Sequence, residues 1–185
     1  IEHAAAFGVF ANGGVKPEEN TTILKVEDTR GDTLYEWKNK KGKQVITPEL
    51  EALMSNVLSD DASRAYVFGT GSVLTLPGRP AAAKTGTTNA YVDAWTVGYT
   101  PQLVTAVWAG NTDNSPMKAG FGGSMVAGKM WNEFMKEALK NEPVVGFPAP
   151  PAIHADKAIL NGALNGGVTL KVNKVTGKLA TSSTP

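Results

Sequence analysis

The 185-residue sequence predicts an α+β protein in which helices flank a mainly antiparallel sheet. Three segments of strand character follow one another at 81–88, 92–99 and 103–110, and the connections between them are short enough for antiparallel hairpins. A segment at 124–140 repeats apolar residues at helical spacing and is long enough to cover one face of this sheet. We therefore expect the three strands to be neighbours in one sizeable core.

The composition is that of a turn-rich globular protein and excludes several functional classes. The formal net charge of +1 gives no reason to expect nucleic-acid binding, and the one basic run, at 38–43, is expected to form a solvated hairpin tip. The chain has no cysteine, which excludes disulfides and thiolate metal sites. His3 and His154 each stand without carboxylate partners at ligand spacing. We therefore expect no metal and no cofactor.

The N-terminal third is expected to hold two helices and a peripheral hairpin. The first helix ends at Gly13-Gly14, where glycine can take the left-handed backbone conformation. Residues 22–37 alternate in polarity on both sides of a turn at 30–32, which predicts a strand hairpin. Thr47 and Pro48 are suited to the N-cap and first position of a second helix. Its buried face is expected to consist of Leu50, Leu53, Met54, Val57 and Leu58.

The remaining segments suggest how the chain is divided. A glycine- and proline-rich passage at 69–80 predicts an irregular loop that leads into the first sheet strand. Four prolines at 142–153 predict a linker. We therefore expect one domain portion at 1–141, the linker at 142–153, and the start of a C-terminal extension at 154–185. In the helix at 124–140, the residues expected to pack on the sheet are Met125, Val126, Met130, Trp131, Phe134, Met135 and Leu139.

The tetrapeptide Lys84-Thr85-Gly86-Thr87 lies where an apolar strand turns polar. Strand alternation would place Lys84 and Gly86 on one side and the two threonines on the other. A glycine inside a strand removes the side chain where another group must approach the backbone. Such a strand can offer an ammonium group, two hydroxyls and a backbone N–H to an anionic substrate.

K-T-G is also the third signature of the serine penicillin-recognising enzymes, whose other signatures are S-x-x-K and S-x-N. The flanking residues narrow the match: "FANGG", "GTG", "GRPAAAKTGTTNAYVDAWTVGYTP", "VWAGNTDNSPM" and "GGSMVAGKMWNEFM" occur in order, and "VTGKLATSSTP" follows more weakly. Together they resemble the C-terminal part of the transpeptidase domain of a class A, bifunctional penicillin-binding protein. The resemblance implies part of the three-layer α/β/α fold that this family shares with the serine β-lactamases.

The resemblance implies a D,D-transpeptidase that cross-links peptidoglycan at the extracytoplasmic face of the bacterial membrane. A serine would attack the D-Ala-D-Ala bond of a stem peptide, and an amine of a neighbouring stem peptide would resolve the acyl-enzyme. The implied partners are stem peptides, β-lactams, and an upstream part of the same protein that carries S-x-x-K and S-x-N. A membrane anchor would also lie upstream.

The family motif assigns roles to individual residues of this chain. Lys84 would supply positive charge and steer protons, and the hydroxyls of Thr85 and Thr87 would bind the terminal carboxylate of the substrate. The backbone N–H of Thr87 would form half of the oxyanion hole, with Gly86 leaving room for the acyl carbonyl. Two further residues are expected at the substrate cleft: Thr88 and Tyr91. Asp93 and the tryptophans are expected to be structural.

The chain itself has no suitable nucleophile. No serine that precedes Lys84 has lysine three residues on, and no serine has asparagine two residues on. Ser115 and Lys118 have the S-x-x-K spacing, but they follow a strand and precede "AGFGG", which does not favour a helix. They also lie downstream of K-T-G, which is the wrong order for the family, so we expect Ser115 not to be the nucleophile.

Two interpretations follow from the missing serine. In the first, the chain is the K-T-G-bearing part of a transpeptidase and is inactive alone, because its nucleophile lies on another part of the protein. In the second, it is a non-catalytic module that binds peptidoglycan or β-lactams, from a truncated or degenerate homologue. A β-lactamase or a small carboxypeptidase is a weaker third option, which the length of the class A match disfavours.

Overall fold

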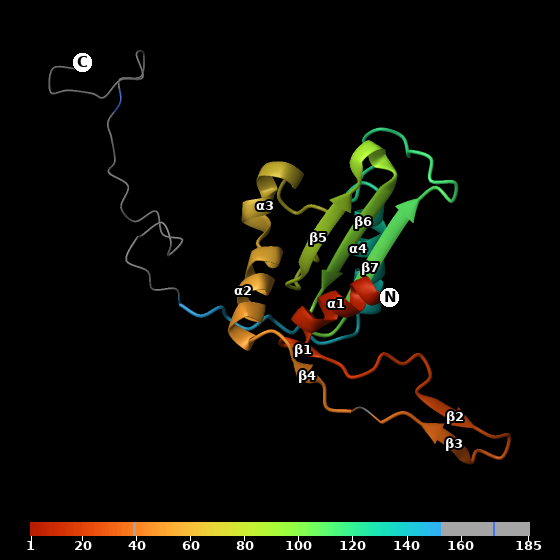
Figure 1. Cartoon of the computed structure of the whole chain (residues 1–185). Helices are drawn as coiled ribbons and strands as arrows, with labels where there is room; N and C mark the ends of the chain where they lie inside the picture. The colour runs from red at the N-terminus through yellow and green to blue at the C-terminus, as the bar shows by residue number, and fades with distance from the viewer. Residues whose placement is uncertain (39, 153–171, 173–185) are drawn as a thin grey trace. The chain divides into compact units, whose positions relative to one another are not determined.

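The structure is a computed structural model, and it describes residues 1–38, 40–152 and 172. The chain divides into two compact units, Ile1–Pro151 and Ala152–Pro185, and the fold described below is that of the first (Figure 1). The predicted extension at 154–185, with His154, lies outside the described residues except for Val172. Among the residues that the structure describes, none of the helices is both long and apolar enough to cross a lipid bilayer.

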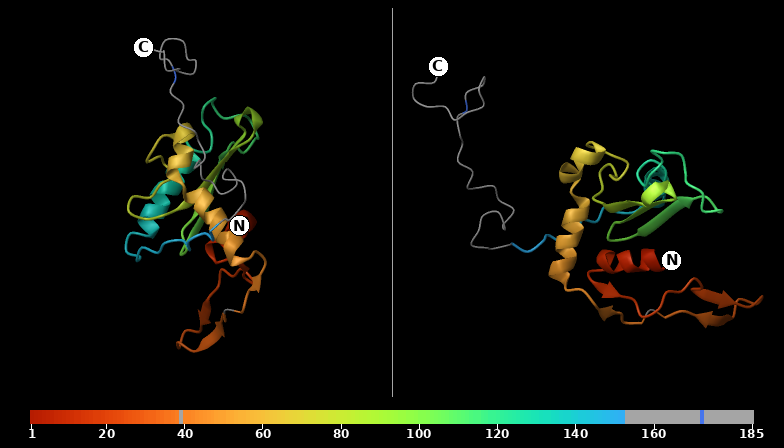
Figure 2. Two further views of the ribbon diagram at one scale, coloured as in Figure 1. Left: turned by 90° about the vertical axis from the view of Figure 1, so that its left-hand side faces the viewer. Right: turned by 45° about the horizontal axis from the view of Figure 1, so that its top comes forward.

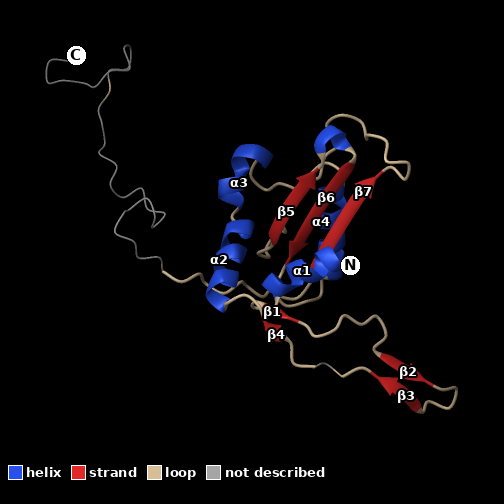
Figure 3. Cartoon of the chain, viewed as in Figure 1, coloured by secondary structure: helices blue, strands red, loops and turns tan. Residues whose placement is uncertain are grey.

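The centre of the fold is a three-stranded antiparallel sheet in the order β5 (Ala82–Thr87), β6 (Asp93–Tyr99) and β7 (Val104–Gly110) (Figure 3). The register pairs Lys84 with Val97 on β6, and pairs Trp95 of β6 with Trp108 of β7. The predicted strands at 81–88, 92–99 and 103–110 are confirmed, as are their adjacency and the α+β fold class.

Helices cover the two faces of this sheet. The ring of Tyr99 lies 6.4 Å from that of Phe7 and 6.3 Å from that of Phe10, both on α1 (Glu2–Ala11). The next residue back, Gly98, faces α4 (Ala127–Ala138) so closely that an added Cβ would lie 2.5 Å from the indole of Trp131. Because successive side chains of a strand point to opposite faces, α1 and α4 form separate layers on either side of the sheet (Figure 2).

The core lies between the sheet and α4. Trp131 and Met135 are fully buried there, together with Leu74, Leu76 and Leu139. The predicted helix is therefore confirmed, although it begins at Ala127, and part of its predicted packing face is wrong. Met125, Met130 and Phe134 are 51%, 45% and 53% exposed, whereas the polar Asn132 is buried. Asn132 occupies the inner face because its amide donates to the carbonyls of Val73 and Thr75, at 3.0 and 2.8 Å.

Helix α2 (Pro48–Ser59) begins as predicted, since the hydroxyl of Thr47 accepts a hydrogen bond from the N–H of Leu50 at 3.3 Å. Its predicted buried face is wrong: Leu50 and Val57 are 53% and 68% exposed, and the buried residues are Glu51, Ala52 and Ser55.

The reason is a polar cluster that joins α2 to the sheet. The Ser55 hydroxyl donates to the Glu51 carboxylate at 2.6 Å and lies 3.0 Å from the hydroxyl of Tyr99. Burial raises the pKa of Tyr99 to about 12. This cluster turns the polar side of α2 inward, which apolar periodicity alone does not anticipate.

The remaining elements are short. Helix α3 (Asp61–Phe68) was not predicted, nor was the pairing of β1 (Val15–Lys16) with β4 (Lys43–Gln44). The predicted hairpin is confirmed as β2 (Lys25–Glu27) and β3 (Thr33–Glu36), whose residues are all exposed, and it extends away from the sheet (Figure 1). Its turn includes Asp28 and Asp32, so the prediction of a hairpin tip at 38–43 is wrong: the described residues of this basic run follow β3, and the last of them, Lys43, is the first residue of β4.

Candidate functional site

Strand β5 passes from the core to the surface along its length. Ala82 and Ala83 are buried, at 0% and 5% exposure, whereas Lys84 and Thr87 are exposed and Thr85 and Gly86 are half-buried. The strand is also an edge strand of the described sheet, with β6 on one side only. Its K-T-G-T segment therefore combines exposed side chains with backbone groups that no described strand pairs.

The direction of those backbone groups follows from the ladder. The N–H of Thr88 donates to the carbonyl of Asp93 at 3.1 Å, so Thr88 faces β6. In an antiparallel ladder this direction alternates, so Gly86 also bonds toward β6, whereas Thr85 and Thr87 direct their N–H and C=O groups to the open edge. The N–H of Thr87 thus points away from β6, toward the edge that no described strand pairs.

The ammonium group of Lys84 lies at the same edge. Its Nζ donates to the carbonyl oxygen of Thr85 at 2.6 Å. None of the ion pairs among the described residues involves Lys84, so no described carboxylate neutralises it. The open edge of β5 therefore presents a cation beside an outward N–H, an arrangement that favours a carboxylate or an oxyanion.

Gly86 lies between these two groups in sequence. A Cβ added there would approach the Cβ of Trp95 at 3.5 Å, which is an ordinary van der Waals contact. The folded chain by itself therefore leaves room for a side chain at position 86. A requirement for glycine would arise from something that lies against the strand.

The two threonine hydroxyls lie on the α4 side of the sheet, opposite to Lys84. The Oγ1 of Thr87 accepts a hydrogen bond from the N–H of Gly123 at 2.9 Å. Thr96, which pairs with Thr85 in the register, donates from its Oγ1 to the carbonyl of Gly123 at 3.0 Å. The loop before α4 is thus hydrogen-bonded directly to the back of the K-T-G strand, a contact that the sequence analysis missed.

The turn between β5 and β6 carries two further predicted site residues. Thr88 uses its hydroxyl within the turn, where it accepts from the N–H of Asp93 at 2.8 Å. The Asp93 carboxylate also accepts from the indole N–H of Trp108 at 2.8 Å, in agreement with the structural role expected for Asp93. Ala90 and Tyr91 adopt φ values of 62° and 57°, an unusual backbone region for residues other than glycine. Tyr91 is 39% exposed on this strained turn.

Ser115 has no helix around it. Residues 111–119 contain neither helix nor strand, and the Ser115 hydroxyl donates to the carboxylate of Asp113 at 2.7 Å. Hydrogen bonds from the hydroxyl and N–H of Ser115 lower the pKa of Asp113. Nothing in this geometry brings Lys118 beside the serine oxygen in the way that an S-x-x-K helix would.

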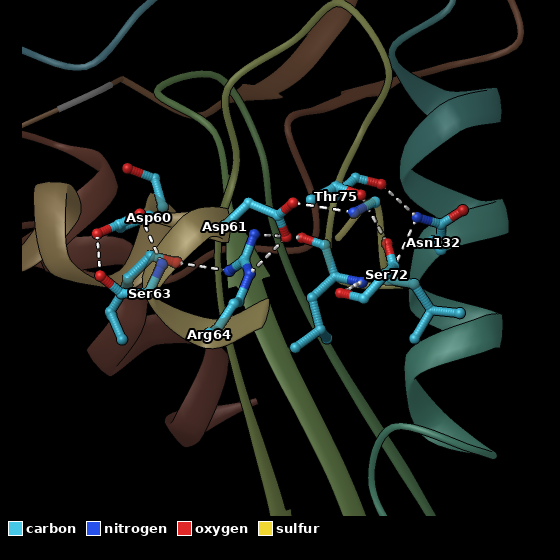
Figure 4. A network of polar contacts seen from close by, with 12 residues as sticks. Asp60, Asp61, Ser63, Arg64, Ser72, Thr75 and Asn132 are labelled. Carbon is cyan, nitrogen blue, oxygen red and sulfur yellow. Dashed lines mark hydrogen bonds and ion pairs between the residues drawn. The ribbon is translucent and has the colours of Figure 1, made fainter. Parts of the chain in front are cut away.

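A polar network fixes the loop that precedes β5 (Figure 4). The Asp61 carboxylate accepts from the N–H of Gly71 at 2.9 Å and from Nε of Arg64 at 3.2 Å. The hydrogen bond from the Gly71 N–H is the main cause that lowers the pKa of Asp61, and Arg64 lowers it further. Arg64 also donates to the carbonyls of Leu58 and Leu74, at 2.9 and 3.2 Å. Together with Asn132, these bonds join α3, the 71–75 loop and α4 behind the site.

His3 belongs to α1 and lies on the face of the sheet opposite to α4. Its ring is 5.2 Å from that of Trp95. Among the described residues, no three His, Asp or Glu side chains come together in a way that could hold a metal ion.

Comparisons with known proteins identify what the chain is similar to. Residues 1–136 match the family model described as "Penicillin binding protein transpeptidase domain". The chain is 36% identical over 157 residues to penicillin-binding protein 2D of Bacillus subtilis, covering 83% of this chain and 22% of that protein. It is 34% identical over 158 residues to penicillin-binding protein 1A of Neisseria lactamica, covering 82% and 19%. The chain thus spans about a fifth of the length of these curated relatives.

Solved structures give the same result. The penicillin-binding protein PonA1 from Mycobacterium tuberculosis matches with a TM-score of 0.69 and 30% identity, over 81% of this chain and 40% of that one. Penicillin-binding protein 1A from Haemophilus influenzae matches with a TM-score of 0.67 over 100% of this chain and 30% of that one, and at 24% identity it supports the fold alone.

Proposed function

Because the chain belongs to the penicillin-binding protein transpeptidase domain family, we propose that it forms the substrate-binding part of a peptidoglycan D,D-transpeptidase. The observation that carries this proposal is the open edge of β5, where the Lys84 ammonium bonds the Thr85 carbonyl at 2.6 Å and the N–H of Thr87 is directed outward. In this proposal the protein works at the extracytoplasmic face of a bacterial membrane.

The open edge suits an extended peptide. A stem peptide laid along β5 would pair with the outward N–H and C=O groups of Thr85 and Thr87, in the manner of strand addition. Its D-Ala-D-Ala carbonyl would then accept from the Thr87 N–H. One such preorganised donor is worth about 3 kcal/mol of transition-state stabilisation. Lys84 would supply positive charge to the reacting groups beside this carbonyl.

The reaction would proceed through an acyl-enzyme. A serine oxygen bonds to the carbonyl carbon, the peptide bond to the terminal D-Ala breaks, and the leaving amine takes up a proton. The amine of a second stem peptide then attacks the ester, forms the cross-link and releases the serine. A β-lactam would acylate the same serine by opening its ring. We propose that this serine lies in a part of the protein outside these 185 residues.

The absence of S-x-x-K and S-x-N ahead of Lys84 favours a second candidate, a module that binds stem peptides or β-lactams without chemistry. The two candidates differ in one observable. A transpeptidase forms a covalent adduct with penicillin, whereas a binding module releases the antibiotic on denaturation.

The test uses the full-length protein and a fluorescent penicillin. We expect covalent labelling of the wild type and a loss of at least about 100-fold in the acylation rate of Lys84→Ala, the size typical of a group that transfers protons or stabilises charge. Lys118→Ala is the matched control, since Lys118 is an exposed lysine of a nearby loop, and its rate should stay at the wild-type level. Equal rates for the two variants would remove Lys84 from the mechanism. A full-length protein that never retains the label would support the binding module instead.

A further inference from the structure

Gly123 is held more firmly than its position in a loop would suggest. Its N–H donates to Thr87 Oγ1 at 2.9 Å, and its carbonyl accepts from Thr96 Oγ1 at 3.0 Å and from the N–H of Gly128 at 2.7 Å. Thr96 is fully buried, and Gly123 is buried as well. Three hydrogen bonds to its N–H and C=O groups therefore fix this residue against the α4 face of β5 and β6.

The loop lies so close to the sheet at position 123 that only glycine fits there. A Cβ on Gly123 would lie 2.5 Å from the carbonyl oxygen of Trp95 and 2.7 Å from that of Gly86. Both atoms belong to the backbone of the sheet and cannot move aside cheaply. A Cβ on the preceding Gly122 would lie 2.8 Å from Thr87 Oγ1 itself. The glycine pair thus allows the loop to reach the Thr87 hydroxyl.

The hydrogen bond from Gly123 restricts the direction in which the Thr87 hydroxyl can donate its single proton. A threonine hydroxyl has one donor and two acceptor lone pairs. Because one lone pair of Thr87 Oγ1 accepts from the N–H of Gly123, the O–H bond must point away from that N–H, and Thr87 is an exposed residue. The hydrogen bond also polarises the hydroxyl and makes it a better donor.

We propose that Gly123 is a positioning residue, whose N–H orients the Thr87 hydroxyl to donate its proton to the terminal carboxylate of the stem peptide or β-lactam. Gly123 touches no substrate and acts only through Thr87. The inference depends on the proposed function, since it needs a carboxylate-bearing substrate at β5. It goes beyond that function by naming which loop residue sets the recognition of the carboxylate.

The experiment measures acylation of the full-length protein by benzylpenicillin and by its methyl ester, which lacks the anionic carboxylate. We expect Thr87→Val and Gly123→Ala to lower the acylation rate for benzylpenicillin at least about 10-fold, the worth of one hydrogen bond to a charged group, and to change the rate for the ester little. Thr87→Ser, which keeps the hydroxyl, should retain the wild-type ratio of the two rates. Gly146→Ala is the matched control, because an added Cβ there meets nothing within 4 Å.

The outcomes separate the two proposals. A wild-type protein that benzylpenicillin does not acylate would overturn the proposed function. A labelled wild type whose Gly123→Ala variant loses both rates equally would overturn the role of Gly123, since it would show a structural effect only. If Gly123→Ala does not fold, Thr96→Val replaces it, because it removes one bond to Gly123 without adding bulk. An unchanged ratio of rates in Thr96→Val would then overturn the inference.

Discussion

The two faces of the central sheet differ in how completely they are covered. On the α4 side, Trp131, Met135 and Thr96 are fully buried, and the loop before α4 is hydrogen-bonded to the strands. On the α1 side, Tyr99 is buried at one end of β6, but Trp108 is 46% exposed and Lys84 is open to solvent. The sheet is thus closely covered on its α4 face and more accessible to solvent on its α1 face.

This difference has a physical use. A group that stabilises developing charge must already be in place when the charge forms, and rigid elements hold such groups more accurately than loops do. In β5 the α4 side supplies the rigidity through Thr87, while the open edge and the α1 side leave Lys84 and the Thr87 N–H accessible. Substitutions on the two sides of the sheet, made in the full-length protein, should therefore differ in their effects.

The largest effect on stability is expected on the α4 side of the sheet. Trp131→Ala should lower the free energy of unfolding by about 3–5 kcal/mol, the usual loss for removing a buried aromatic ring. Phe134→Ala on the same helix is the control, because Phe134 is 53% exposed and should cost less than about 1 kcal/mol. Urea denaturation followed by circular dichroism measures both. Equal losses of unfolding free energy in the two variants would show that α4 does not pack against the sheet through one face only.

The next effect concerns the end of α4. Arg79 donates to the side chain of Gln102 at 2.8 Å and to the carbonyls of Pro143 and Leu139, at 2.9 and 3.1 Å. Arg79→Ala should therefore cost about 2–3 kcal/mol, the range for hydrogen bonds of a charged donor. Arg79→Lys should recover only part of this loss, since an ammonium group cannot reproduce the planar fork of donors. Full recovery by lysine in thermal unfolding would count against this assignment.

A smaller, pH-dependent effect is expected on the α1 side. The pKa of Tyr99 is raised from 10.0 to about 12 by burial, so its contribution to stability is complete below pH 10 and is lost as the pH rises toward 12. Tyr99→Phe should cost about 1 kcal/mol at neutral pH, because it removes the contact with Ser55. Its unfolding free energy should then fall less steeply than that of the wild type above pH 10. Parallel curves would mean that Tyr99 is not the titrating group.

The smallest effect is expected in the network ahead of β5. The pKa of Asp61 is lowered, first by the N–H of Gly71 and then by Arg64, so its stabilising contribution is present above the ordinary carboxyl value of 3.8 and is lost as the pH falls below it. Asp61→Asn should cost less than about 1 kcal/mol at neutral pH, since the carboxylate is partly solvated. Its stability should also depend less on pH below that value. An Asp61→Asn variant whose stability depends on pH below 3.8 as steeply as that of the wild type would contradict this assignment.

Local sequence patterns predicted the sheet well, because alternation and short connections are properties of neighbouring residues. The motifs around Lys84 also led to a family resemblance that the match over residues 1–136 confirms. The inner face of α2 could not be predicted, since Ser55 finds its partner Tyr99 44 residues along the chain. The contact between Thr87 and Gly123 spans 36 residues and was missed for the same reason. The pair Gly122-Gly123 was a usable signal, but only the fold shows which strand it approaches.

The most direct test of the account locates the acylated residue. The full-length protein and the 185-residue chain are each incubated with labelled penicillin, and the adducts are mapped by peptide mass spectrometry. We expect one adduct in the full-length protein, on a serine outside these 185 residues, and none on the isolated chain. An adduct on a serine within the chain, such as Ser115, would contradict the claim that β5 binds and polarises a substrate that another part of the protein attacks.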